Sequence, residues 1–574
     1  MSNETDTAQG QPTVKTRPPA REPMAGRKAA IILSLILLVS LAVRLLCFSG
    51  VGISDSLGYV WAGGNAAEGK YPWEEYPFVY IRPGFVLPLA VLVSWWGYGL
   101  WTPALYNLAC SLGLVVLTYA IGRMLFDRKA GLWAAAVIAV STMAIGNGTG
   151  VVPDTPQAFF CALSIALALI AARKSGGSRV SGLCFAAGVA LGMAWLVKCT
   201  SVFVAPALLL IVLRMRQHRR LAIIFGLVGF GLIFLSEMAF WASVSGYPLE
   251  RFRVLFPSGS AAALDTTDPF FSLWEYPIKM FVIISADGLF YYLLVPAVLW
   301  SAVRARRRAA VALVWLAVFF LFLQFGSLSF TEYKPFYHQP RYLMPLVPAG
   351  AILAGAWLCT VARKHARIAG ALYLLYAVPS LLLAYVSPLT THTPAVAAKA
   401  AVDILEGRQA REVYSDRAFA SAMNYFRRND PRQLPKVSRW LEYDLKPTVD
   451  PAARPGAHVV RFDGTLRRIA RGPDADATLD RIHAGIEAAA STERIPLQYG
   501  RPQRAVMRWI WRLLRKAPLP ERASRRLQSA FSRHLAEPVV VIYRIRGRGE
   551  EPASAPGRGA GSSSPSRVAD ESDG

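Results

Sequence analysis

The sequence predicts a polytopic α-helical membrane protein that carries a water-facing α/β domain near its C-terminal end. Hydrophobic residues make up 54% of the 574 residues, and the mean hydropathy is +0.33, which is too apolar for an ordinary soluble protein. Apolar stretches close to the roughly 20 residues that cross a bilayer recur from Ala29 to about Tyr385. From about Pro394, charged and mixed segments replace them, which indicates a separate compact domain.

The chain therefore divides into four predicted parts. These are a disordered cytoplasmic N-terminus (1–28), a transmembrane domain (29–390), a soluble outer-face domain (391–546) and a disordered Gly/Ser/Pro-rich tail (547–574). The polar start, basic near its end and followed by an apolar run, resembles a signal sequence. No small-x-small cleavage site follows Leu45, so we interpret the run as a retained first helix.

The positive charge of the chain favours a membrane partner over nucleic acid. The formal net charge is +26, but the basic residues lie mainly in short loops between apolar runs and in the C-terminal part. All six cysteines lie in or beside apolar segments, which argues against a disulfide framework or a cysteine zinc site. The seven histidines lack metal-ligand spacing, and only His338 falls in a loop expected near the candidate site.

Loops rich in Arg and Lys predict the sidedness of the membrane domain, because cytoplasmic loops carry the excess of positive charge. These loops are 123–129, 173–179, 214–220, 304–308 and 363–367. Loops poor in Arg and Lys, which are expected on the outer side, are 146–154, 198–200 and 329–341.

With a cytoplasmic N-terminus, this pattern predicts about eleven crossings. They lie near 29–48, 101–122, 131–146, 155–172, 181–197, 200–213, 221–244, 282–303, 309–328, 342–361 and 368–387. Because the number is odd, the C-terminal domain is expected on the outer face. The segment Phe85–Trp96 is shorter than a full span and contains Pro88, so we expect it to lie in the outer interface.

Two acids, Asp55 and Asp154, fall on the outer side at the ends of apolar runs. The stretch "EGKYPWEEYPFVYIRPGF" falls on the same side. Charge pattern alone leaves open that Asp55 is a solvated loop residue. The sequence "PDTPQ" also fits a structural role for Asp154 as a helix N-cap.

Several short motifs, taken in order, resemble GT-C membrane glycosyltransferases. They are Asp55 just beyond the first helix, "NAAEGKYPW", "IRPGFVLPLA", the "G-x-x-x-W-x-x-x-L" step near Gly97, "VVPDTPQAFFCALSIAL", "GLCFAAGVALGMAWLVKCTSVFVAPALLL" and "QPRYLMPLVPAGAILAG". The resemblance covers about residues 29–390 and is to the branch that contains protein O-mannosyltransferases and the aminoarabinose transferase of lipid A. Two positions depart from it: Ser56 stands where a second acid is common, and "RPGF" replaces "K-P-P-L".

The resemblance implies an enzyme that moves a hexose or pentose from a polyprenyl-phosphate carrier to an acceptor on the outer face. The acceptor would be a protein, a lipid or a polysaccharide. Asp55 would act as general base on the acceptor, and Arg82 is the leading cation for the carrier phosphate. Lys198 would bind the same phosphate or extend to the lipid headgroups, and Arg341 would bind it or anchor a helix at the interface. Asp154 would orient the acceptor, assist Asp55 or ligate a divalent cation, for which no cofactor site is otherwise indicated.

Two other functions compete with a multi-pass glycosyltransferase of a bacterial-type inner membrane. A transporter or flippase of lipid-linked sugars would share the apolar helices and basic loops without needing Asp55, but no internal repeat is evident. A noncatalytic scaffold would leave the outer acids and cations without a role.

A basic segment of the C-terminal domain, "RPQRAVMRWIWRLLRK", places arginines along one predicted helical stripe, at Arg504, Arg508, Arg512 and Arg515. The stripe fits a helix on anionic headgroups, and an ordinary helix packed on the soluble domain fits equally.

Overall fold

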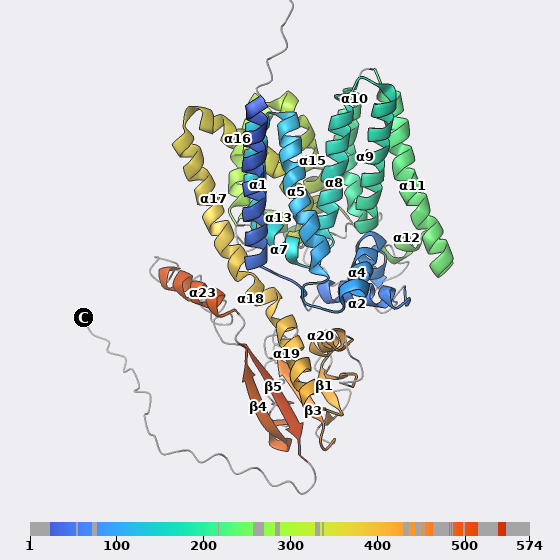
Figure 1. Ribbon diagram of the computed structural model, residues 1–574, viewed down its shortest axis with the longest axis vertical. Helices are drawn as coiled ribbons and strands as arrows, with labels where there is room; N and C mark the ends of the chain where they lie inside the picture. The colour runs from blue at the N-terminus through green and yellow to red at the C-terminus, as the bar shows by residue number, and fades with distance from the viewer. Residues whose placement is uncertain are drawn as a thin grey trace, which may run out of the picture.

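A computed structural model places a helical bundle above a smaller domain that contains a β-sheet (Figure 1). The residues it describes are 23–52, 55–71, 77–215, 217–255, 269–281, 288–327, 333, 335, 338–428, 435–441, 450–451, 454–462, 481–482, 484, 486–497, 500–514 and 538–546. Of the predicted disordered N-terminus (1–28), residues 23–28 belong to the first helix, which begins at Pro23, so the predicted boundary is wrong by six residues. Residues 1–22 and the predicted tail 547–574 lie outside the described part of the chain.

The bundle consists of apolar helices, long and short, that lie within the predicted crossings or differ from them by several residues at the ends. They are α1 (Pro23–Leu46), α5 (Ala104–Leu125), α6 (Arg128–Ala139), α7 (Thr142–Thr149), α8 (Asp154–Ala171), α9 (Gly177–Val197), η1 (Cys199–Val204), α10 (Ala205–Leu213), α11 (Arg219–Ser245), α14 (Phe290–Arg304), α15 (Arg306–Phe325), α16 (Val347–Lys364) and α17 (Ala366–Val386).

Within the described residues, eight helices are long and apolar enough to cross a membrane, or nine if the bent pair α6 and α7 forms one span. Two predicted crossings correspond to shorter apolar segments, Cys199–Leu213 and Phe290–Arg304. The pair α6 and α7 bends by 62°, where Ser141 begins a new helix by accepting a hydrogen bond from Ala144 N. The count of eleven crossings therefore stays a prediction.

Side-chain contacts gather the basic loops at one end of the bundle. Arg363 Nη2 lies 2.5 Å from Asp127 Oδ2, and His218 Nε2 lies 2.9 Å from the carbonyl oxygen of Ser175. Arg173 donates to the carbonyl of Met124. The sheet-containing domain and α2 (Asp55–Ala67) lie at the opposite end, as Figure 1 shows. The relative sidedness of the loops therefore agrees with the arginine pattern, and the orientation in a cell stays a prediction.

Short helices cover the end of the bundle that faces the sheet-containing domain (Figure 1). Besides α2 they are α3 (Pro77–Tyr80), α4 (Pro83–Trp96), α12 (Glu250–Leu255), α13 (Pro269–Phe281) and η3 (Pro340–Leu346). Helix α4 packs beside α2, and Trp95 and Trp96 at its end are exposed. Exposed tryptophans are typical of the membrane interface, which is where the sequence places this segment.

The bundle packs closely because small residues face one another and the few buried polar groups are paired. A Cβ atom at Gly188 of α9 would lie 2.0 Å from the carbonyl oxygen of Gly226 in α11, so only glycine permits this approach. Arg44 is fully buried, and its Nε donates to Ser111 Oγ at 2.7 Å. Large apolar side chains such as Leu235 and Leu375 are exposed on the outside of the bundle, as expected of a lipid-facing surface.

The C-terminal domain contains a mixed five-stranded sheet in the order β2-β1-β3-β5-β4. After α18 (Pro388–Thr391), its elements are α19 (Thr393–Gly407), β1 (Val413–Asp416), α20 (Arg417–Arg427), β2 (Ser438–Leu441), β3 (His458–Phe462), β4 (Ala490–Pro496), α23 (Arg501–Leu514) and β5 (Val539–Ile545). Strands β2, β1 and β3 are parallel, and β5 pairs antiparallel with β3 and β4. The predicted α/β character of this region is therefore present.

The C-terminal domain contacts the bundle end through α2 and α20. Trp61 Nε1 donates to the carbonyl of Ser421 at 3.2 Å, and Arg428 Nη2 donates to Asn65 Oδ1 at 2.7 Å. One apolar cluster also includes residues of α2, α4, α19 and α20. The helix that starts with Asp55 is thus held between the bundle and the C-terminal domain.

The predicted arginine stripe of α23 is wrong in one respect. Arg504 is only 2% exposed and so is unavailable to headgroups, whereas Arg508 and Arg512 are exposed. The helix also contacts α17 of the bundle. Arg515 lies outside the described residues.

The two ends of the bundle can be distinguished by cysteine labelling. Cysteines replacing the exposed Lys70 and Arg494 should react with an impermeant thiol reagent from the outer side, whereas cysteines replacing the exposed Lys129 and Arg306 should not. The unsubstituted protein is the control, because five of its six cysteines are buried and Cys199 is partly exposed. Labelling of all four positions from one side would contradict the arrangement.

Candidate active site

The two predicted acids are brought to the same end of the bundle by the segments that precede them. Gly50 forms a parallel bridge with Gly150, and the backbone N–H of Ser49 donates to Thr149 Oγ1 at 2.9 Å. Asp55 lies in the first turn of α2 and Asp154 in the first turn of α8. Pairing of the preceding segments therefore sets both helix starts beside each other.

Asp154 is fully buried and forms an ion pair with Lys198, whose Nζ lies 2.7 Å from Asp154 Oδ1. Lys198 follows the last residue of α9, and its ammonium lies 3.7 Å from the ring centroid of Tyr342. Lys198 is itself 8% exposed, so the interpretation that it extends to the headgroups is wrong. The N-cap interpretation of Asp154 is also wrong, because Pro153 occupies the N-cap and no side-chain cap bond forms.

Arg341 lies between the two acids. Its Nη2 donates to Asp55 Oδ2, and its Nε lies 3.8 Å from Asp154 Oδ2. Asp55 is half-exposed, with 47% of its side chain accessible. The guanidinium thus links a buried carboxylate to one that solvent can reach.

Arg82 is placed near the same cluster by a close contact between two helices. A Cβ atom on Gly84, in the first turn of α4, would lie 2.7 Å from Leu196 Cβ and 2.8 Å from the backbone N of Val197, at the end of α9. Only glycine allows α4 to approach the end of α9 so closely. Arg82, the residue before α4, donates to the hydroxyl of Tyr59 in α2, and burial lowers the pKa of its guanidinium.

Several buried polar atoms of this region have no hydrogen-bond partner among the described residues. They are Asp154 Oδ2, Arg341 Nε, Thr155 Oγ1, Gln157 Oε1 and Ser201 Oγ. Buried polar groups in folded proteins are nearly always satisfied, so such a group of atoms is typical of a site that binds a polar ligand or water. The amide of Gln157 is held in place by donating to Thr200 Oγ1 at 2.8 Å.

The charge state of Lys198 depends on its surroundings. Burial lowers the pKa of its ammonium to about 8, and the charge of Asp154 acts in the opposite direction. The side chain therefore approaches its titration range near neutral pH while remaining mainly protonated at pH 7.

Four residues near the cluster were not among the sequence-predicted candidates. Tyr342 lies beneath Lys198. Glu275 Oε2 lies 2.9 Å from His338 Nδ1, while Lys279 lies 2.5 Å from Glu275 Oε1 and donates to the carbonyl of His338. Tyr276 OH donates to the carbonyl of Gln339 at 3.2 Å.

These contacts fasten the residues just before Arg341 to α13. An acid and a lysine four residues apart in the otherwise apolar "FFSLWEYPIKMF" were a detectable signal. The contacts of Glu275 and Lys279 with His338 could not be predicted from the sequence, because they join segments that are far apart in the chain.

The described residues contain no group of three His, Cys, Asp or Glu side chains that could hold a metal ion. Both acids of the cluster already face basic side chains. A divalent cation at Asp154 would have to replace the contact with Arg341 or Lys198.

Comparison with known proteins supports the resemblance seen in the motifs. Residues 83–241 match the model of the dolichyl-phosphate-mannose-protein mannosyltransferase family. None of the proteins with curated functions matches the chain significantly.

Solved structures of membrane glycosyltransferases also resemble the chain. ArnT from Cupriavidus metallidurans, solved in the apo state and bound to undecaprenyl phosphate, is 16% identical with a TM-score of 0.52, over 78% of this chain and 95% of that chain. The oligosaccharyltransferase AglB from Archaeoglobus fulgidus, in complex with an inhibitory peptide and a dolichol-phosphate, is 14% identical with a TM-score of 0.48, over 70% and 64%. Another structure of an oligosaccharyltransferase from that organism is matched over 61% of its length.

The structural likeness to ArnT concerns the fold, because the identity is low, and the family match concerns a defined segment of the chain. The two findings agree with each other and with the order of the motifs. The resemblance to GT-C membrane glycosyltransferases is therefore confirmed: the chain has the fold of ArnT, and residues 83–241 match the mannosyltransferase family model.

Proposed function

We propose that this chain transfers a sugar from a polyprenyl-phosphate carrier to an acceptor on the outer face of the membrane, with Asp55 as general base. The observation that carries the proposal is the meeting of a half-exposed carboxylate, Asp55, with a buried group of cations and acid at one end of the bundle. The undecaprenyl phosphate bound to the ArnT structure supports a carrier of this class.

The chemistry of the reaction accounts for the residue types. A phosphate is a good leaving group, so the donor needs charge neutralisation more than protonation as its bond to the sugar breaks. Lys198, Arg341 and Arg82 supply positive charge at the cluster. The acceptor must lose a proton as it attacks, and an ionised carboxylate within hydrogen-bond reach can take it.

The ion pair between Asp55 and Arg341 must be broken before Asp55 can act as a base. A carboxylate that faces a guanidinium stays ionised but is a weaker base than a free one. We propose that the carrier phosphate attracts Arg341 when the donor binds. Asp55 would then be released to accept the proton of the acceptor, so donor binding would precede base catalysis.

Replacement of Asp55 by Asn tests the base. The variant keeps the size of the side chain but removes the proton acceptor, so turnover should fall by roughly 100-fold or more. The measurement is sugar transfer from a radiolabelled polyprenyl-phosphate donor by purified protein in liposomes. Asp403→Asn is a matched control, because Asp403 is an exposed carboxylate of α19 that pairs only locally with Lys399.

Near-normal transfer by Asp55→Asn would remove Asp55 as base. Movement of the intact lipid-linked sugar across the liposome membrane without transfer would favour the transporter alternative.

Asp154 and Lys198 should stabilise the folded protein only when both charges are present. Lys198→Met should destabilise the protein by about 3–5 kcal/mol, because it leaves a buried carboxylate with less compensation. The double variant Lys198→Met with Asp154→Asn should recover part of that loss, since neither charge then remains. Thermal unfolding of detergent-solubilised protein measures the stability of the single and the double variant. A double variant less stable than Lys198→Met would contradict the pairing.

The pH dependence of kcat/KM for the donor should follow the protonation of Lys198. Its ammonium loses charge as pH rises through about 8, so kcat/KM for the donor should fall by on the order of tenfold between pH 7 and pH 9. Lys198→Arg should remove that decline, because a guanidinium stays protonated over this range. Identical pH profiles for the two proteins would exclude Lys198 as the titrating group.

A further inference from the structure

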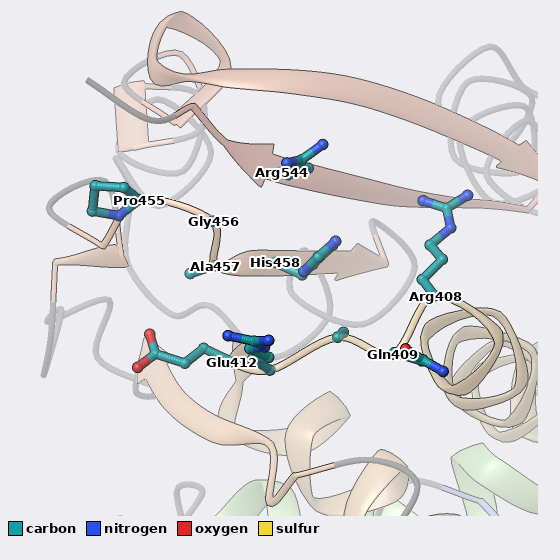
Figure 2. Close-up of a pocket in the computed structure, with 10 residues that line it drawn as sticks. Arg408, Gln409, Glu412, Pro455, Gly456, Ala457, His458 and Arg544 are labelled. Carbon is teal, nitrogen blue, oxygen red and sulfur yellow. The ribbon is translucent and has the colours of Figure 1, made fainter. Parts of the chain in front are cut away.

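The C-terminal domain contains a pocket that is separate from the carboxylate and cation cluster. Its volume is about 780 Å³, and ten residues line it, among them Arg408, Gln409, Arg411, Glu412, His458 and Arg544. Figure 2 shows it between the end of α19 and the strands β3 and β5. Because β3 begins here and β5 ends here, the pocket lies at the ends of these strands, on the side away from the bundle where α19 ends (Figure 1).

Positive charge dominates the lining. Three arginines face one acid, Glu412, among the ten residues. In Figure 2 the carboxylate of Glu412 points away from His458, and its Oε1 lies 4.0 Å from Arg454 Nη1. Arg408 forms an exposed ion pair with Glu493 of β4, at 2.5 Å, which holds its guanidinium above the sheet without burying it.

His458 provides a buried polar group beside these cations. The residue is 9% exposed, and its Nδ1 has no hydrogen-bond partner within the described part of the chain. Its backbone is fixed, since its N–H donates to the carbonyl of Glu412 at 2.9 Å. A buried imidazole nitrogen without a hydrogen-bond partner destabilises the folded protein unless a ligand supplies the missing hydrogen bond.

The backbone around the pocket is also unusual. Gln409 is the one non-glycine residue of the described segments with a positive φ, 52°. That conformation costs free energy in a residue with a Cβ atom. It turns the chain sharply between Arg408 and Arg411, so that both arginines border the same space.

We propose that this pocket binds an oxyanion, a carboxylate or phosphate group carried by an acidic sugar. Arginine side chains match the geometry of such groups, and the imidazole of His458 supplies a further donor when protonated. The distance of the pocket from the bundle along α19 argues against the headgroups of the surrounding bilayer. That an oxyanion binds follows from the pocket alone, whereas its attachment to a sugar rests on the proposed function.

Binding should be coupled to protonation of His458. In the free protein, burial and then the charges of Arg408 and Arg544 lower the pKa of this imidazole. Arg411 adds positive charge, while Glu412 and Glu493 are already paired with Arg454 and Arg408. A bound anion offsets these cations and raises the pKa, so the protein takes up a proton on binding and the affinity increases as pH falls.

Calorimetric titration of the full-length protein in detergent tests the site with four probes: glucuronate, glucose 6-phosphate, glucose and inorganic phosphate. Glucuronate and glucose 6-phosphate should bind, and glucose, which lacks an oxyanion, should not. The double variant Arg411→Gln with Arg544→Gln should bind glucuronate at least about tenfold more weakly, because two guanidinium groups that would donate to the oxyanion are removed. Arg494→Gln, which changes an exposed arginine of β4 outside the pocket, should bind as the unsubstituted protein does.

The pH dependence separates His458 from the arginines. Glucuronate keeps one charge between pH 5.5 and pH 8 because its carboxyl group titrates at far lower pH, near about 3 to 4. Its affinity should therefore rise toward pH 5.5 in the unsubstituted protein and stay level in His458→Asn. An unchanged elution profile and unfolding temperature establish that each variant is folded.

Equal binding of glucose and glucuronate, or equal loss in the Arg494→Gln control, would overturn the proposal. If the double arginine variant still binds inorganic phosphate and glucuronate as the unsubstituted protein does, the proposal is overturned as well. Because the experiment measures binding and not transfer, failure of the sugar-transfer function would leave oxyanion binding measurable. Binding of inorganic phosphate without either sugar ligand would retain the oxyanion site and reject the sugar.

Discussion

The arrangement of this end of the molecule depends on one buried carboxylate. Asp154 is fully inaccessible, and an ion in such a place is stable only with opposite charge and hydrogen bonds close by. Lys198 and Arg341 provide the charge. Because these residues come from the end of α9 and from η3, the carboxylate requires α8, α9 and η3 to meet. It also leaves Arg341 able to reach Asp55 on α2.

A second buried ion pair, between Arg251 and Glu237, helps to hold the end of α9 that carries Lys198. Arg251 of α12 lies 2.5 Å from Glu237 of α11, and its Nη2 donates to the carbonyl of Leu196 at 3.3 Å. That carbonyl belongs to the last turn of α9, where helical carbonyls lack intrahelical partners. Trp195 Nε1 also donates to Glu237, at 2.7 Å. The end of α9, and with it Lys198, is therefore held by contacts from α11 and α12.

The C-terminal domain limits the movement of the first acid. Helix α2 begins with Asp55 and packs on α4 on one side and α20 on the other. Its contacts with the C-terminal domain include Trp61 and Asn65. The proposed base is thus exposed to an acceptor while the helix that carries it is fixed. The proposed oxyanion pocket lies in the C-terminal domain, at strand ends on the side away from the bundle.

The sequence by itself determined the class of the fold and the residue types at the site. Hydrophobicity over about 20 residues is a local property, so each apolar helix could be located to within several residues. Arginine in the short loops likewise predicted that Asp55 and the C-terminal domain share one end. The motif order indicated Asp55, Arg82, Asp154, Lys198 and Arg341, and the structure brings these residues to one region.

Only the tertiary structure decided the partners of those residues. "PDTPQ" reads locally as a helix cap, but Asp154 instead pairs with a lysine 44 positions away. For Lys198 the sequence allowed a phosphate ligand or a headgroup anchor, and its burial excludes the anchor. The predicted stripe on α23 includes Arg504, which is buried as well. The grouping of His338 with Glu275, and of His458 with Arg408 and Arg544, also joins distant segments. Sequence patterns report the preference of a side chain for water or lipid, whereas burial and pairing depend on which other segment arrives beside it.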